Sequence, residues 1–203
     1  FCFIWAECNE GEVELWPDYP YGGCFDIETT TSIDFDYYVN INDVIPPEIG
    51  QLVNLEYLDL SGAAFPNYNG GLGLTGGIPP EIGNLTNLNY LNLSGNPLGG
   101  SIPDELGNLI NLNELHLESN ELEGEIPNEL GNLNALYRLK LSNNTLSGSI
   151  PSEIGLLDEL RWIFLDNNNL TNTIPDFENS LLRWLILNDN NLSGNLPWIA
   201  SDL

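Results

Sequence analysis

Positive charge is scarce in this sequence of 203 residues. Four Lys and Arg stand against 30 Asp and Glu, so the formal net charge is 4 − 30 = −26 with histidine neutral. Proteins that bind nucleic acid take much of their affinity from Lys and Arg contacts with phosphates, and a field this negative repels a polyanion. The composition therefore argues against a nucleic-acid partner.

Long hydrophobic runs and catalytic constellations are missing as well. No stretch approaches the about 18 consecutive apolar residues of a membrane span, so we expect no transmembrane segment. Histidine occurs once, at His116, and no candidate nucleophile, second histidine or Gly-rich phosphate loop accompanies it. We therefore expect no enzymatic activity, no cofactor and no metal site.

Cysteine occurs only near the start, as Cys2, Cys8 and Cys24. The segment between Cys8 and Cys24 is polar, aromatic and Gly-rich without metal-ligand spacing, which favours a disulfide between these two residues over a zinc site. The opening FCFIWAEC resembles the tail of a secretory signal peptide with cleavage after Ala6, which would remove Cys2. Alternatively Cys2 is retained, free or paired between chains. Both interpretations place the protein outside a reducing cytosol, in the extracellular space or at the cell surface.

A repeat of 24 residues accounts for most of the chain, in the form LxxLxLxxNxLxGxIPxE(I/L)GxLxx. Copies start at Leu55, Leu88, Leu112, Leu136, Leu160 and Leu182. Leucines at a spacing of two point inward from a short strand, the Asn satisfies backbone groups at the following turn, and Gly-x-Ile-Pro redirects the chain. Because one copy cannot bury its apolar face alone, the copies are expected to stack into a solenoid.

We expect an α/β-type repeat solenoid, a right-handed leucine-rich arc with a parallel β-sheet on the concave face and few helices, as 3-10 or short turns on the convex side. Residues 1–6 are expected to be the signal-peptide remnant and 7–31 an N-terminal cap. The solenoid covers 32–198, as a degenerate first turn plus six repeats with an insertion at about 62–73. Residues 199–203 are expected to be a truncated C-terminal end.

The Gly-x-Ile-Pro-x-x-Ile/Leu-Gly variant of the repeat resembles the plant-type leucine-rich-repeat family. Members include polygalacturonase inhibitors, receptor-kinase ectodomains and a plant antifreeze protein, and the repeats are also similar to those of extracellular bacterial proteins. The resemblance covers roughly residues 8–198. It implies that the chain binds a ligand, most often protein or carbohydrate, on the concave face.

All four basic residues fall in columns that project from or flank the concave sheet. Within LxxLxLxx the third, fifth and seventh positions project from the sheet, and the second and eighth flank it. The basic residues lie in the last three repeats beside aromatic residues, where an exposed apolar group typically marks an interface. We call this set the C-terminal patch and predict that it binds a protein or glycan ligand: Tyr137, Arg138, Lys140, Arg161, Trp162, Phe164, Arg183, Trp184, Ile186 and, as an exposed member, His116.

Other interpretations remain open from the residues alone. Trp162 on Trp184 and Arg161 near Asp166 could be cross-strand pairs that only stabilise the sheet. The protein could instead be a structural or adhesive surface protein or filament subunit that self-associates through the C-terminal end or Cys2. A weaker alternative is ice binding, which requires a flat and regular array of small polar side chains. The inserted loop is a further candidate contact site.

One column is expected to be purely structural. An asparagine recurs after the expected strands, at the point where the chain turns, except in the copy that starts at Leu55, where Ala63 takes its place. The members of this column are Asn96, Asn120, Asn144, Asn168 and Asn190. Their side chains are expected to bond the backbone rather than a ligand.

Overall fold

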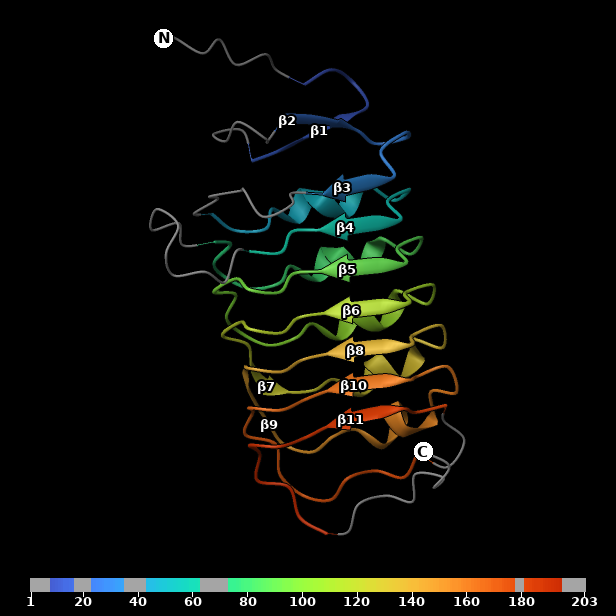
Figure 1. Ribbon diagram of the computed structural model, residues 1–203. Coiled ribbons are helices and arrows are strands. Elements are labelled where there is room, and N and C mark those ends of the chain that lie inside the picture. The colour runs from blue at the N-terminus through green and yellow to red at the C-terminus, as the bar shows by residue number, and fades with distance from the viewer. Residues whose placement is uncertain (1–7, 17–22, 35–42, 63–72, 178–180, 195–203) are drawn as a thin grey trace.

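The computed structural model describes residues 8–16, 23–34, 43–62, 73–177 and 181–194, and within them the chain forms an elongated stack of coils (Figure 1). The β-strands are β1 (Glu12–Leu15), β2 (Gly23–Asp26), β3 (Ser32–Asp34), β4 (Tyr57–Asp59), β5 (Tyr90–Asn92), β6 (Glu114–His116), β7 (Glu123–Glu125), β8 (Arg138–Lys140), β9 (Thr145–Ser147), β10 (Trp162–Phe164) and β11 (Trp184–Ile186). The 3-10 turns are η1 (Pro47–Gln51), η2 (Pro80–Asn84), η3 (Asp104–Asn108), η4 (Asn128–Asn132) and η5 (Ser152–Leu156). The described residues contain no α-helix, which confirms the expected leucine-rich-repeat solenoid.

A seven-stranded sheet runs along one side of the stack in the order β11-β10-β8-β6-β5-β4-β3, with every pair parallel. The middle residue of a strand points into the core, as Leu115 and Leu139 do, and both are fully buried. The residues before and after it face outward. Because neighbouring strands pair in register, equivalent positions of successive repeats form straight columns on the outer face of the sheet.

The five 3-10 turns lie behind the sheet, across the core (Figure 1). Each follows a proline of the Ile-Pro motif, whose fixed backbone angle suits the entry into a helical turn. Each ends when the backbone N–H of a leucine bonds to a carbonyl three residues earlier, as Leu85 N does to Ile82 O at 3.0 Å. The turn motif therefore closes each coil and returns the chain to the next strand.

A short parallel pair, β7 with β9, and the isolated bridges Val44 with Thr75 and Thr173 with Ser193 connect coils on a third side. The asparagine column lies inside the coils, as expected. Asn144 donates from Nδ2 to Leu117 O at 2.9 Å and to Leu141 O at 3.0 Å, and its Oδ1 accepts from Leu122 N at 3.1 Å. Each of these side chains thus ties its coil to a neighbour, and the structural role of the column is confirmed.

A second amide ladder escaped sequence analysis. Asn54, Asn87 and Asn111 precede successive strands, and each donates from Nδ2 to a carbonyl of the preceding coil at 2.9, 2.9 and 2.8 Å. The Asn-Leu pair repeated before β4, β5 and β6 was the available signal. The ladder ends where Ala135, Glu159 and Leu181 occupy the same position of the repeat.

The N-terminal end of the solenoid is covered by the antiparallel hairpin of β1 and β2. A disulfide joins Cys8 to Cys24 with 5.5 Å between the Cα atoms, so the expected pairing is present. Glu12 lies near both sulfurs, but the disulfide leaves no thiolate there to hold a metal. Trp16 is buried against the first coils and donates from Nε1 to Val44 O at 2.9 Å.

Three expectations fall outside the described residues. They concern the fate of Cys2, the inserted loop, and self-association through the end of the chain, because residues 1–7, 63–72 and 195–203 lie outside the described ranges. The described part of the chain contains no helix that is both long and apolar enough to span a bilayer.

Candidate binding site on the concave face

The outward columns of the sheet change in chemistry along the solenoid. From β4 to β11 the third column reads Tyr57, Tyr90, Glu114, Arg138, Trp162, Trp184, and the fifth reads Asp59, Asn92, His116, Lys140, Phe164, Ile186. The first strands therefore carry tyrosine, carboxylate and amide groups, the central strands carry charge, and the last two carry large apolar groups. A flat, regular array of small polar side chains, as ice binding would require, is not found in these two columns.

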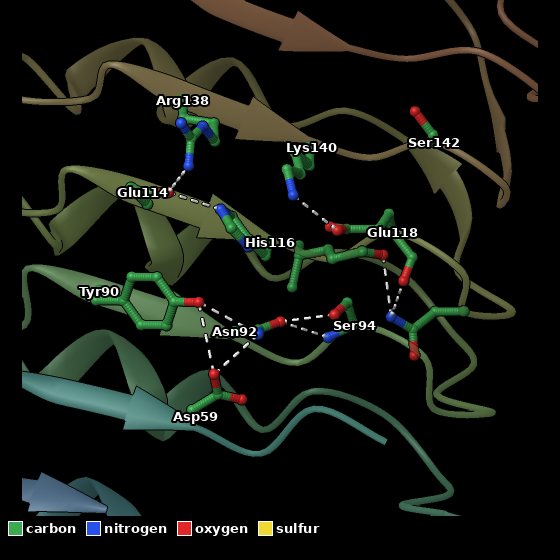
Figure 2. Close-up of polar contacts among 12 residues, drawn as sticks. Asp59, Tyr90, Asn92, Ser94, Glu114, His116, Glu118, Arg138, Lys140 and Ser142 are labelled. Atoms are coloured by element: carbon green, nitrogen blue, oxygen red, sulfur yellow. Dashed lines mark hydrogen bonds and ion pairs between the residues drawn. The ribbon is translucent and has the colours of Figure 1, made fainter. Parts of the chain in front are cut away.

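Glu114 is the centre of a polar cluster on β6 and β8 (Figure 2). Its carboxylate accepts a hydrogen bond from the Tyr137 hydroxyl, and Arg138 Nη1 lies 2.5 Å and His116 Nε2 2.9 Å from its Oε2. Burial of the Glu114 carboxyl opposes ionisation. The hydrogen bond from Tyr137 and the charge of Arg138 outweigh that effect and hold the pKa of Glu114 below its ordinary value.

Cross-strand ion pairs explain why so acidic a chain places two of its four basic residues on β8. Arg138 pairs with Glu114, and Lys140 Nζ lies 3.2 Å from Glu118 Oε1, so β8 neutralises carboxylates presented by β6 and by the turn after it (Figure 2). Both basic residues of β8 are therefore paired with carboxylates within the concave face.

His116 is not the exposed member of the patch that its column position predicts. Its exposed fraction is 6%, and the Tyr90 ring meets its edge at 5.4 Å between ring centroids. An ionised carboxylate only accepts hydrogen bonds, so Nε2 of His116 carries a proton and donates to Glu114. The expectation was wrong because the Tyr90 ring packs against the imidazole and the Glu114 carboxylate bonds to it.

Trp162 is held in place from two directions. The Arg138 guanidinium lies over its ring, with Cζ 4.6 Å from the centroid, and the Tyr137 ring meets it edge-on at 5.5 Å. Trp184, the next residue in the column, has an exposed fraction of 58%. Phe164 and Ile186 lie half-buried beside these two. Trp162, Phe164, Trp184 and Ile186 form what we call the apolar platform.

The two remaining arginines flank this platform. Arg161 Nη2 lies 3.5 Å from Glu159 Oε2, in place of the anticipated partner Asp166, which accepts from Ser142 Oγ at 2.5 Å. Arg183 is exposed and makes no ion pair with any residue that the structure describes. The structure thus brings the predicted patch together on β8, β10 and β11, with its accessible part at the end nearest β11.

A polar network at the opposite end of the concave face was missed by sequence analysis. The rings of Tyr57 and Tyr90 stack with 4.5 Å between centroids, and Asn92 Nδ2 donates to Asp59 Oδ2 at 3.0 Å (Figure 2). Burial and the nearby Asp59 charge raise the pKa of Tyr90. The signal was the pair of tyrosines aligned in the third column. With its amide and carboxylate groups bonded to one another, this end is an ordered polar surface.

We expect His116 to make folding sensitive to mild acid. Burial and the repulsion of Lys140 lower its pKa below the ordinary 6.5, although Glu118 and Glu114 favour its charged form. The unfolded chain therefore binds this proton at a higher pH than the folded chain, and stability falls as pH drops from about 6.5 through the folded pKa. Urea unfolding at pH 7.5 and 5.5 should show a loss that His116→Gln largely removes. An unchanged loss in the variant would assign the sensitivity to other groups.

Comparisons with known proteins come from family matching and from solved structures. Residues 87–109, 111–133, 135–157 and 159–181 match the Leucine Rich Repeat family. A comparison with curated protein sequences finds no match. Among solved structures, a chain of the BIR3–SERK2 complex from Arabidopsis thaliana is 35% identical, with 71% of this chain and 73% of that chain covered and a TM-score of 0.57.

Two receptor structures are similar over a small part of their length. The leucine-rich-repeat ectodomain of the membrane receptor kinase GASSHO1/SCHENGEN3 from Arabidopsis thaliana, in complex with CASPARIAN STRIP INTEGRITY FACTOR 2, is 40% identical with a TM-score of 0.68. The Arabidopsis receptor kinase HAESA, in complex with the peptide hormone IDA and the co-receptor SERK1, is 34% identical with a TM-score of 0.66. Each match covers 76% of this chain, which spans 18% of the first and 25% of the second.

Proposed function

We infer the function of this chain from the premise that it belongs to the plant-type leucine-rich-repeat family. We propose that it is a recognition module, secreted or at the cell surface, that binds a segment of a partner protein through the apolar platform. The proposal assigns it no catalytic step. The observation that carries the proposal is the exposure of Trp184 beside Trp162, Phe164 and Ile186 on the concave face.

A partner that covers the platform would remove its apolar surface from contact with water, which favours binding. Exposed aromatic side chains gathered on one face are characteristic of binding hot spots, because tryptophan buries a large area with few rotatable bonds. Trp162 is already immobilised by Arg138 and Tyr137, so it loses little freedom when a ligand packs on it. This part of the sheet therefore combines an accessible ring with an ordered neighbour.

A protein segment is favoured over a glycan by two considerations. The similar structures include a receptor kinase in complex with a peptide hormone and a co-receptor, which are protein ligands. In addition, the platform is made of two indoles with a phenylalanine and an isoleucine, a composition that suits apolar side chains of a peptide. Glycan recognition would be expected to add several amide or carboxylate groups to the ring face itself.

The test is selection of a displayed peptide library on the intact protein, with a glycan array probed in parallel. We expect selected peptides to lose at least about tenfold in affinity with Trp184→Ala, which corresponds to a typical hot-spot residue. The melting temperature should stay nearly unchanged, because the Trp184 side chain is mostly exposed.

Leu156→Ala is the matched control for this experiment. Leu156 is also a large apolar residue with an exposed fraction of 70%, but it lies in η5 on the other side of the core. Peptides should bind this variant as they bind the native chain. Selected peptides that bind Trp184→Ala equally well, or binding confined to the glycan array, would contradict the proposal.

A further inference from the structure

Two arginines lie side by side next to the apolar platform. Arg161 and Arg183 occupy the same position of successive repeats, and Arg183 N donates to Arg161 O at 2.8 Å. They immediately precede Trp162 and Trp184, which are paired in register on β10 and β11. Neighbouring strands are about 4.8 Å apart, so two like charges are held at the same edge of the sheet, an arrangement that is unfavourable unless an anion is near.

Among the described residues, the carboxylates of the protein itself do little to neutralise these two arginines. The contact of Arg161 with Glu159 is long, at 3.5 Å, and both side chains are substantially exposed, so it contributes little. Nε of Arg161 is buried without a hydrogen-bond partner, and Arg183 makes no ion pair with the described part of the chain. By contrast, Arg138 and Lys140 are each matched to a carboxylate on the concave face. Among the residues that the structure describes, the two guanidinium groups beside the platform are therefore the most weakly paired cations.

The distribution of charge along the chain makes this place distinctive. Residues 1–137 contain 22 Asp and Glu and no Lys or Arg, for a net charge of −22, while residues 138–203 contain 8 acidic and 4 basic residues, for a net charge of 8 × (−1) + 4 = −4. A ligand with many negative charges is repelled by most of the molecule. A ligand with a single carboxylate meets favourable charge beside Arg161 and Arg183.

Apolar groups next to these arginines define the rest of the ligand. Trp184 is exposed on the concave side of Arg183, and Leu181, two residues before Arg183, has an exposed fraction of 54%. A group that binds here can contact indole or leucine with its apolar part while its charged part faces guanidinium. Arg suits such a site because its planar fork donates two parallel hydrogen bonds to a carboxylate.

We propose that Arg161 and Arg183 form a carboxylate subsite at the edge of the apolar platform, and that the partner segment carries one acidic group next to a bulky apolar side chain. This inference rests on the proposed function and specifies the chemistry of the ligand. Of the four basic residues in the predicted patch, it assigns the charged part of recognition to Arg161 and Arg183, because Arg138 and Lys140 are paired within the sheet.

The test uses a matched pair of small probes, N-acetyltryptophan, which has a carboxylate, and N-acetyltryptophanamide, which does not. Each is titrated into protein labelled with ¹⁵N in tryptophan, and the indole N–H resonance of Trp184, assigned with Trp184→Phe, is followed. We expect the carboxylate probe to bind about fivefold more tightly at low salt, and the difference to shrink as salt is added. The double variant Arg161→Gln, Arg183→Gln should bind the two probes equally.

Lys140→Gln serves as the control, since it removes a cation of the same face that is already paired with Glu118 and does not contact the platform rings. The preference for the carboxylate probe should survive in this variant. Equal binding of the two probes to the native chain, or a preference that persists in the double arginine variant, would overturn the carboxylate subsite and leave the platform standing. If neither probe moves the Trp184 resonance at about 50 mM, the platform itself fails, and the proposed function with it.

Discussion

Replacing Asn144 by alanine is expected to lower the free energy of unfolding by about 3 kcal/mol or more. The side chain is buried and satisfies two carbonyls, of Leu117 and Leu141, and the backbone N–H of Leu122. Alanine leaves the backbone N–H of Leu122 without a partner in a place that water reaches poorly, which costs roughly 1–3 kcal/mol. The carbonyls of Leu117 and Leu141 each lose one hydrogen bond, worth about 1 kcal/mol, and keep a second from Asn120 and Asn168. Urea denaturation monitored by circular dichroism measures the change.

The last rung of the same ladder provides the control for this result. Asn190 makes equivalent bonds, to Leu165 O at 2.8 Å, to Leu187 O at 3.1 Å and from Leu170 N at 3.0 Å, but its side chain is only half-buried. Water can replace its contacts, so Asn190→Ala should cost about 1 kcal/mol. If both variants lose the same free energy of unfolding, hydrogen bonding within the coil, rather than burial between coils, determines how much each asparagine contributes to stability.

Gly107→Ala is expected to be at least as damaging, for a steric reason. A Cβ atom at Gly107 would lie 2.4 Å from the backbone oxygen of Glu129 and 2.7 Å from its Cβ, because η3 and η4 pack closely across this glycine. Neither obstacle can rotate away, so the coils must separate. Overpacking of a rigid site typically costs about 1–3 kcal/mol and occasionally more, and we expect the upper end. A thermal melt should show a clear drop in the transition temperature.

Gly99→Ala is the corresponding harmless substitution. The nearest atom to a Cβ at Gly99 is Glu121 O at 4.0 Å, which is an ordinary contact. Alanine also reduces the freedom of the unfolded chain, so this variant should be neutral or gain up to about 1 kcal/mol. A loss like that of Gly107→Ala would show that glycine is needed in the repeat for reasons other than the approach of neighbouring coils.

The repeat spacing predicted the architecture because each signature residue performs one local task. Leucines at a spacing of two fill the core, Ile-Pro starts each 3-10 turn, and Asn144 and its equivalents bond the backbone. These tasks depend on contacts within one coil or with the next, so a period in the sequence reproduces them in space. The disulfide was predictable for a similar reason, since Cys8 and Cys24 lie in one short cap.

The repeat period could not predict how the outward side chains of the same columns interact with one another. Column positions predict which side chains face outward, but not which of them pair with one another and are therefore not free to bind a ligand. Arg138 is matched by Glu114 on the adjacent strand, and Tyr137 and His116 converge on the same carboxylate. Such pairing depends on side-chain length and rotamer, which the repeat does not encode. For this reason the repeat columns could not separate the paired cations Arg138 and Lys140 from Trp184 and its flanking arginines, where we propose that the ligand binds.

The asparagine ladders also limit how a peptide can lie on this face. They fix the distance between successive coils at about 4.8 Å, whereas alternate side chains of an extended peptide recur at roughly 6.8 Å. A segment running across the strands therefore drifts out of phase with the columns after one or two contacts. The side chains of the peptide and the columns of the sheet therefore come into contact only at separated positions. Recognition on such a face depends on a few strong anchors, and its specificity comes from the distance between them.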